Sequence, residues 1–146
     1  MATVLLISGP NLQLLGERDP AVYGQATLAD HVGRAEAAAA RHGVVLEHLQ
    51  ADAEAILVEA VHGARRRVDA IVVNAGALTH YGWSLHDALA TFEGPVVELH
   101  LSNPETREPW RRTSVVAPVA DGTIAGFGGL GYELAVDAAI RLLKKR

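Results

Sequence analysis

Short, mostly apolar runs separated by segments of helical character constrain this chain more than any other feature. The runs cover residues 4–7, 44–49, 69–73 and 96–99, and valine, leucine and isoleucine dominate them. Runs of this kind are typical of parallel strands that are buried on both faces of a sheet. Residues 115–117 predict a short fifth strand.

The segments between these runs predict helices. The hydroxyl of Thr27 can cap a helix over residues 27–41, together with the Asp30 carboxylate. Asp52 is expected to cap the next helix, which carries apolar side chains on one face. These side chains belong to Ile56, Leu57, Ala60 and Val61.

Two more helices, over residues 83–92 and 130–145, complete an alternation of strands and helices along the chain. Such alternation favours an α/β fold in which helices cover both faces of a parallel sheet. The chain has 146 residues, which fits one domain spanning residues 1–146.

Composition excludes several classes of protein. The chain has no cysteine, so it holds no disulfide scaffold, thiol nucleophile or cysteine-rich zinc site. Its net charge of −4 argues against a nucleic-acid-binding protein. No apolar run approaches the ~20 residues of a membrane span, and the N-terminus lacks the basic region of a signal peptide. We therefore expect a cytoplasmic location.

Polar and ionisable residues gather where this fold class places a ligand, at the carboxyl ends of the strands. Residues 12–26 predict a long loop after the first strand, and loops of this length inside a domain are usually functional. Glu98 lies in the fourth strand. The other candidates follow the first, third and fourth strands, and they are Asn11, Arg18, Tyr23, Asn74, Thr79, His80, His100, Ser102, Asn103, Arg107 and Arg111.

Two cofactor alternatives have weak support. His80, His86 and His100 lack the close spacing of metal ligands, so no metal site is expected. Residues 126–131 fit the pattern G-x-G-x-x-G of dinucleotide-binding proteins, but they follow the last predicted strand, so no βαβ unit can form there. These glycines are more simply explained by a tight turn before the last helix.

A lone asparagine or histidine can equally serve a turn or the core. We interpret four histidines as structural, namely His31, His42, His48 and His62.

Several motifs, in order along the chain, closely resemble those of the type II 3-dehydroquinate dehydratases. They are Gly-Pro-Asn-Leu-Gln-Leu-Leu-Gly-Glu-Arg-Asp-Pro at residues 9–20 with Tyr23-Gly24, Asn-Ala-Gly-Ala-Leu-Thr-His at 74–80, Glu-Leu-His-Leu-Ser-Asn at 98–103, Arg107-Glu108 with Trp110-Arg111, and residues 126–132. The resemblance implies a flavodoxin-like three-layer fold with a five-stranded parallel sheet. It also implies reversible dehydration of 3-dehydroquinate to 3-dehydroshikimate without a cofactor, in the shikimate pathway or in quinate catabolism. The implied assembly is a dodecamer built as a tetramer of trimers.

The resemblance assigns the two proton transfers. Tyr23 matches the base, although a free phenol, with a pKa near ~10, is a poor base at neutral pH. Arg18 matches the cation that would favour its phenolate form. His100 matches the general acid, and Glu98 lies on the same face of a strand, where its carboxylate could orient the imidazole.

Other matching positions bind or position the substrate. Asn11 matches a residue that places a water at the enolate oxygen. Leu101 and Ser102 match a binding site for the substrate carboxylate. The residues that match those holding ring hydroxyls are Asn74, His80 and Arg111. Asp87 matches a residue that reaches a neighbouring subunit's site.

The sequence departs from the family pattern at Gln13, Ala51-Asp52, Tyr81-Gly82 and His86. The alternative to an enzyme is a binding module of the same fold that has lost turnover.

Overall fold

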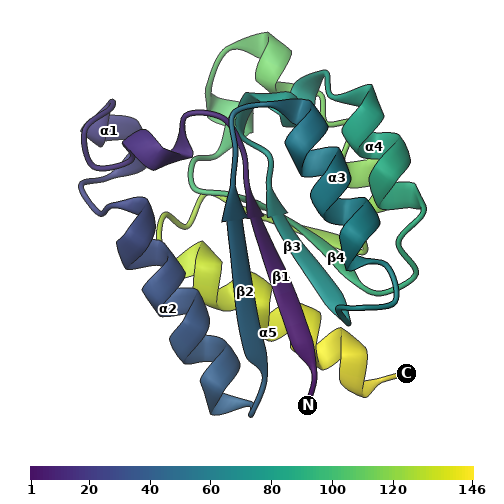
Figure 1. The fold of residues 1–146 in the computed structure, drawn as a ribbon. Helices are drawn as coiled ribbons and strands as arrows, with labels where there is room; N and C mark the ends of the chain where they lie inside the picture. Colours follow the sequence, from purple (N-terminus) through teal and green to yellow (C-terminus); the bar gives the residue numbers. More distant parts are fainter.

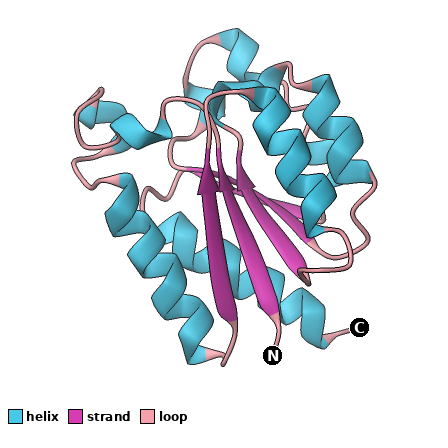
Figure 2. Cartoon of the chain, in the orientation of Figure 1, coloured by secondary structure: helices cyan, strands magenta, loops and turns pink.

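Five parallel strands form one sheet at the centre of the computed structural model, which describes residues 1–146 (Figures 1 and 2). The strands are β1 (Thr3–Ser8), β2 (Val45–Gln50), β3 (Ala70–Asn74), β4 (Val96–His100) and β5 (Gly122–Ala125). They lie in the order β2-β1-β3-β4-β5, and every pair is parallel. The predicted flavodoxin-like fold is confirmed.

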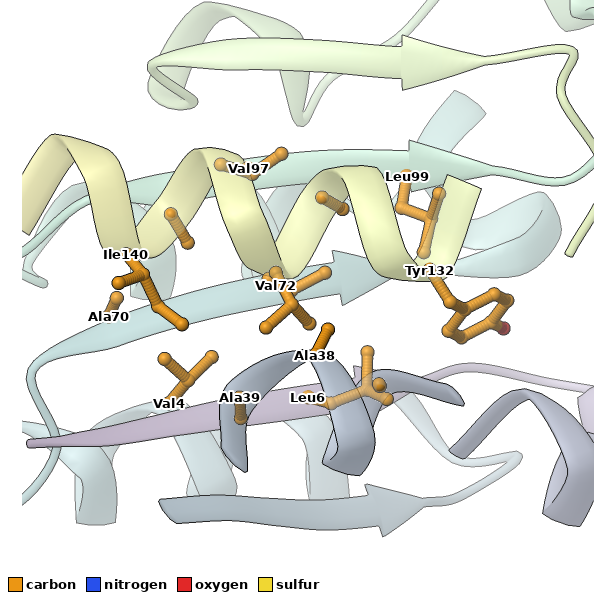
Figure 3. Close-up of a cluster of buried hydrophobic side chains, with 14 of the residues drawn as sticks. Val4, Leu6, Ala38, Ala39, Ala70, Val72, Val97, Leu99, Tyr132 and Ile140 are labelled. Atoms are coloured by element: carbon orange, nitrogen blue, oxygen red, sulfur yellow. The ribbon is translucent and has the colours of Figure 1, made fainter. Parts of the chain in front are cut away.

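Two helices cover each face of the sheet (Figure 1). The long helices are α2 (Leu28–Arg41), α3 (Glu54–Ala64), α4 (Trp83–Ala90) and α5 (Leu130–Lys144). Helices α2 and α5 enclose one apolar cluster against the sheet, and α3 and α4 enclose the other. Figure 3 shows the first cluster, where alanines of α2 let the helix approach the side chains of β1 and β3.

Shorter helical segments occupy the connections. They are η1 (Leu12–Leu14), α1 (Pro20–Tyr23), η2 (Gly76–His80), η3 (Pro104–Thr106), η4 (Pro109–Arg112) and η5 (Ala117–Val119). Residues 12–26, expected to be a loop, therefore contain η1 and α1. Pro20 occupies the first helical position of α1, where its missing N–H is not needed.

The predicted start of α2 is confirmed in detail. The Thr27 hydroxyl accepts from the Asp30 N–H, and the Asp30 carboxylate accepts from the Thr27 N–H.

The predicted cap of α3 is wrong. Ala53 occupies the cap position, and Asp52 instead accepts hydrogen bonds from the N–H of Asn11 and the side chain of Gln13.

The helix α3 also differs from its predicted apolar face. Leu57 and Val61 are buried, whereas Ile56 is 46% exposed. Residue 56 lies about 100° from Leu57 around the helix axis, which takes it off the face that meets the sheet.

The predicted fifth strand at residues 115–117 is wrong. Val115 and Val116 are buried, but their N–H groups bind the Thr79 carbonyl and the Ser114 hydroxyl rather than a neighbouring strand. The fifth strand is β5, which lies at the edge of the sheet beside β4 and is largely exposed. An edge strand this short carries too few apolar residues to be recognised by hydrophobicity.

No helix of the structure is long and apolar enough to cross a membrane.

Candidate active site

The predicted site residues lie where the strand order reverses, at the carboxyl ends of β1, β3 and β4. In a sheet of order 2-1-3-4-5 this reversal falls between β1 and β3, and it opens a crevice for ligands. Gly9 allows the loops after β1 and β3 to touch, because a Cβ atom there would collide with the backbone of Ala75. The close approach brings Asn11 and Asn74 to one cavity.

This cavity has a volume of about 190 Å³ and receives side chains from every predicted site segment. Nine of the eleven residues to which the resemblance assigns a role line it, namely Asn11, Arg18, Tyr23, Asn74, His80, His100, Leu101, Ser102 and Arg111. The other lining residues are Pro10, Leu12, Gly76, Ala77, Pro104 and Arg107. Its ionisable lining therefore includes three arginines and two histidines but no carboxylate, which suits an anionic ligand.

Tyr23, at the end of α1, lies close to two guanidinium groups. Arg18 donates to the phenol oxygen over 3.2 Å, and its Cζ atom lies 4.4 Å from the centre of the ring. The Cζ atom of Arg107 lies 5.1 Å from the same ring centre. The only phenol in the cavity lining therefore has two positive charges beside it.

Arg107 was recognised in the sequence only as part of a polar loop and a motif, without a role. In the structure it also donates to the Ser102 hydroxyl over 3.1 Å, so it links the phenol to the loop after β4. Its place in that motif and in the same loop as Ser102 were the signals in the sequence.

Glu98 and His100 form a buried pair on β4. The Nε2 atom of His100 lies 2.7 Å from the Glu98 carboxylate, which is 1% exposed. Because a carboxylate only accepts, Nε2 carries a proton and the opposite nitrogen, Nδ1, is left for the reaction. Strand geometry explains the pairing, since residues two apart point to the same face.

Three hydroxyls complete the surroundings of the Glu98 carboxylate. Those of Thr79, Ser114 and Thr123 donate to it over 2.5, 2.7 and 3.1 Å. Burial alone would raise the pKa of Glu98, but the hydrogen bond and charge of His100, with the Thr79 and Ser114 hydroxyls, lower the pKa to about 2. Glu98 therefore remains ionised at neutral pH and holds His100 in place.

This lowered pKa predicts a specific loss of stability in acid. The contribution of ionised Glu98 is complete above its ordinary pKa of 4.5 and is lost as the pH falls toward about 2. The free energy of unfolding of the wild type, relative to Glu98→Gln, is expected to fall by about 3 kcal/mol across this window. Urea unfolding at a series of pH values measures the difference, and a constant difference would contradict the assignment.

His80 and Arg111 approach the cavity from η2 and η4. The Nδ1 atom of His80 donates to the Thr113 carbonyl over 2.6 Å. Burial lowers the pKa of His80, and the Thr113 hydrogen bond only partly opposes this. A neutral His80 with a proton on Nδ1 presents Nε2 as an acceptor for a ligand hydroxyl. Arg111 stacks 4.1 Å from the Trp110 ring centre and pairs with Glu108, which fixes its guanidinium.

Two residues to which the resemblance assigns a role, Glu98 and Asp87, lie outside the cavity lining, as do the candidates Thr79 and Asn103. Glu98 lies behind His100, as described above. The Asp87 side chain is on α4 and is 87% exposed, so within one chain it reaches no part of the cavity. The structure contains no group of three or more histidine, cysteine, aspartate or glutamate side chains that could hold a metal ion.

Comparisons with known proteins agree with this geometry. The family model for class II dehydroquinases matches residues 2–140. A protein of Desulforudis audaxviator named 3-dehydroquinate dehydratase is 49% identical over 97% of this chain and 95% of its own length. A catabolic 3-dehydroquinase of Penicillium rubens is 46% identical over 92% of this chain and 87% of its own. The crystal structure of a type II dehydroquinase from Butyrivibrio crossotus superimposes with a TM-score of 0.92 at 34% identity, covering 95% of this chain and 97% of that one. This chain belongs to the class II dehydroquinase family.

Proposed function

We propose that this cavity dehydrates 3-dehydroquinate to 3-dehydroshikimate, so that the protein is a hydro-lyase. The observation that carries the proposal is that two groups face one cavity whose lining has no carboxylate. One is the Tyr23 phenol, beside two guanidinium groups, and the other is the His100 imidazole, which the Glu98 carboxylate holds. A base and an acid are the two groups that removal of water next to a ketone requires. Some relatives bear the name 3-dehydroquinate dehydratase and others the name catabolic 3-dehydroquinase, and aromatic biosynthesis and quinate catabolism would both use this step.

Tyr23 is the base in this proposal. Its phenolate, stabilised by Arg18, takes the proton from the carbon next to the ketone of the substrate. The electron pair of the broken C–H bond forms an enolate, whose oxygen is stabilised by a water held by Asn11. Such a preorganised donor stabilises charge that develops in the transition state.

His100 is the acid. As the enolate collapses, the carbon–oxygen bond of the β-hydroxyl breaks, and the proton of His100 leaves with that oxygen as water. Glu98 stabilises the imidazolium before the transfer, because its carboxylate stays ionised at neutral pH. The Leu101 and Ser102 N–H groups and the Ser102 hydroxyl bind the substrate carboxylate.

Three further side chains of the cavity hold the ring hydroxyls of the substrate. They are Asn74, His80, which accepts through Nε2, and Arg111, which donates. Asn74 ends β3, and His80 and Arg111 follow β3 and β4, so the three fix the ring relative to both proton-transfer groups.

The assay that tests the proposal follows the conjugated enone of 3-dehydroshikimate by its ultraviolet absorbance. Purified protein mixed with 3-dehydroquinate is expected to produce this absorbance. A folded protein that binds 3-dehydroquinate without producing the enone would instead be a binding module of the same fold.

Activity is expected to be independent of metal ions, because the proposed proton transfers use side chains alone. Protein dialysed against EDTA should retain its full rate in the enone assay. A loss of activity that a divalent ion restores would contradict the mechanism.

The proposal includes a cytoplasmic dodecamer, a tetramer of trimers, in which Asp87 reaches a neighbouring subunit's site. The exposure of Asp87 and of Trp83, which is 63% exposed on the same helix, supports an interface at α4. Asp87→Ala is therefore expected to lower activity although the residue lies outside its own cavity. Sedimentation during turnover tests the assembly, and a fully active monomer would contradict it.

A further inference from the structure

A chain of buried polar side chains leads away from Asn74, on the side of the sheet covered by α2 and α5. Ser8 and Asn74 are neighbours at the ends of β1 and β3, and they are 0% and 3% exposed. Tyr132, in the first turn of α5, is fully buried above them. Figure 3 shows its ring at the end of the apolar cluster, with the hydroxyl pointing away from the aliphatic side chains.

These side chains lie beside one another in sequence. The Asn74 Nδ2 atom donates to the Tyr132 hydroxyl over 3.2 Å. The Ser8 side chain lies near the same hydroxyl and opposes the rise in its pKa that burial causes. The Ser8 hydroxyl lies 2.8 Å from Nε2 of His48, on the neighbouring strand β2. The chain therefore runs from the catalytic cavity to a strand that does not line it.

The donors in this chain have one consistent direction. Because the Tyr132 oxygen accepts from Asn74, its own proton is free to turn toward Ser8, which leaves the Ser8 proton for His48. His48 must accept through an unprotonated Nε2. Burial lowers the pKa of His48, with Glu36 opposing the shift, which favours this neutral ring.

The Gly76 N–H determines which way the Asn74 amide points, and the Tyr132 hydroxyl holds the amide in that position. Its Oδ1 atom accepts from the Gly76 N–H over 3.3 Å, and one hydrogen of Nδ2 is held by Tyr132. The second hydrogen of Nδ2 is left for a ligand in the cavity that Asn74 lines. A reversed amide would place Nδ2 of Asn74 against the Gly76 N–H. Two donors would then face each other without an acceptor.

The Tyr132 ring itself is held in place by stacking. His31, which is 2% exposed, lies parallel to it with 4.9 Å between ring centres and an angle of 3° between the planes. Gly129 makes room for this imidazole, because a Cβ atom there would come within 2.7 Å of it. The hydroxyl of Tyr132 is thus presented to Asn74 by a ring with little freedom to move.

We propose that Tyr132, Ser8 and His48 are positioning residues that fix the Asn74 amide as a donor to a hydroxyl of the bound substrate. None of the three lines the substrate cavity, so they act through Asn74. The inference rests on the proposed dehydration of 3-dehydroquinate.

The test is a double-mutant cycle of Tyr132→Phe and Asn74→Ala in the enone assay. Tyr132→Phe keeps the stacked ring and removes only the hydroxyl, and we expect it to raise KM for 3-dehydroquinate about tenfold, with a smaller change in kcat. In the Asn74→Ala background the same substitution should leave KM unchanged, because the group it positions is gone. A purely structural role for the hydroxyl would lower Tm in both backgrounds and leave KM unaltered.

Variants of His48 provide a matched pair. His48→Gln retains an oxygen acceptor for Ser8 and should keep KM near the wild-type value, whereas His48→Leu removes the acceptor and should raise KM. A KM within twofold of wild type for both Tyr132→Phe and His48→Leu would overturn the inference, as would equal effects of Tyr132→Phe with and without Asn74.

Failure of the proposed function gives a different result, because the wild type itself would then form no enone. In that case the positioning is judged from the crystal structure of Tyr132→Phe. An Asn74 amide that is rotated or has two conformers supports the positioning role of Tyr132, and an amide that has not moved overturns it.

Discussion

Tyr23→Phe is expected to lower the dehydration rate by about 10²–10⁴-fold, the usual contribution of a general base. The hydroxyl is the only group of this side chain that phenylalanine lacks, and the one side-chain hydrogen bond that it makes is accepted from Arg18. The substitution therefore removes the base without disturbing the core. Exchange of the substrate proton next to the ketone with solvent deuterium should be lost as well, because the same group removes that proton.

Two further variants bracket this result. Tyr81→Phe removes the hydroxyl of a tyrosine that is 60% exposed and outside the cavity, and it should retain the wild-type rate. Arg18→Ala should resemble Tyr23→Phe near neutral pH, because the phenol then loses the cation that favours its ionised form. Its rate should partly recover as the pH rises.

His100→Asn is expected to separate the two proton transfers. It removes the acid that protonates the departing hydroxyl, so enone formation should fall by about 10²–10⁴-fold. Proton removal by Tyr23 does not depend on this group, so exchange at the carbon next to the ketone should continue. The enolate would form and return to substrate, as a stepwise elimination requires.

The matched control for this variant is His62→Asn, which makes the same change at an exposed position on α3. It should retain both dehydration and exchange. His100→Asn leaves the buried Glu98 carboxylate without its imidazole, so its fold is checked by circular dichroism. Simultaneous loss of dehydration and exchange in a folded His100→Asn protein would contradict a separate acid and base.

The sequence predicts the parts of the fold that follow from burial and capping. β1 and β3 are buried on both faces, so their apolar runs are unbroken, and α2 begins where Thr27 and Asp30 form reciprocal hydrogen bonds. Because strands were recognised by the burial of their apolar residues, the fifth strand was predicted wrongly. Val115 and Val116 are buried without pairing, whereas β5 is paired without being buried.

The motifs named the site residues directly, because they carry more information than hydrophobic periodicity does. Tyr23, His80 and His100 line one cavity in the structure, and their roles stay predictions. The contact of Arg107 with Tyr23 and the hydroxyl contacts to Glu98 were not foreseen. Arg107 and Thr79 were candidates without a role, and Ser114 is an ordinary loop residue in the sequence. Only the return of the chain toward β4 gives these residues their partners.

The measurement that tests the central claim most directly is proton NMR of 3-dehydroquinate in D₂O with wild type, Tyr23→Phe and His100→Asn. The account predicts exchange and dehydration with the wild type, neither with Tyr23→Phe, and exchange alone with His100→Asn. Unimpaired exchange with Tyr23→Phe would eliminate Tyr23 as the base and leave His80 or His100 to remove the proton.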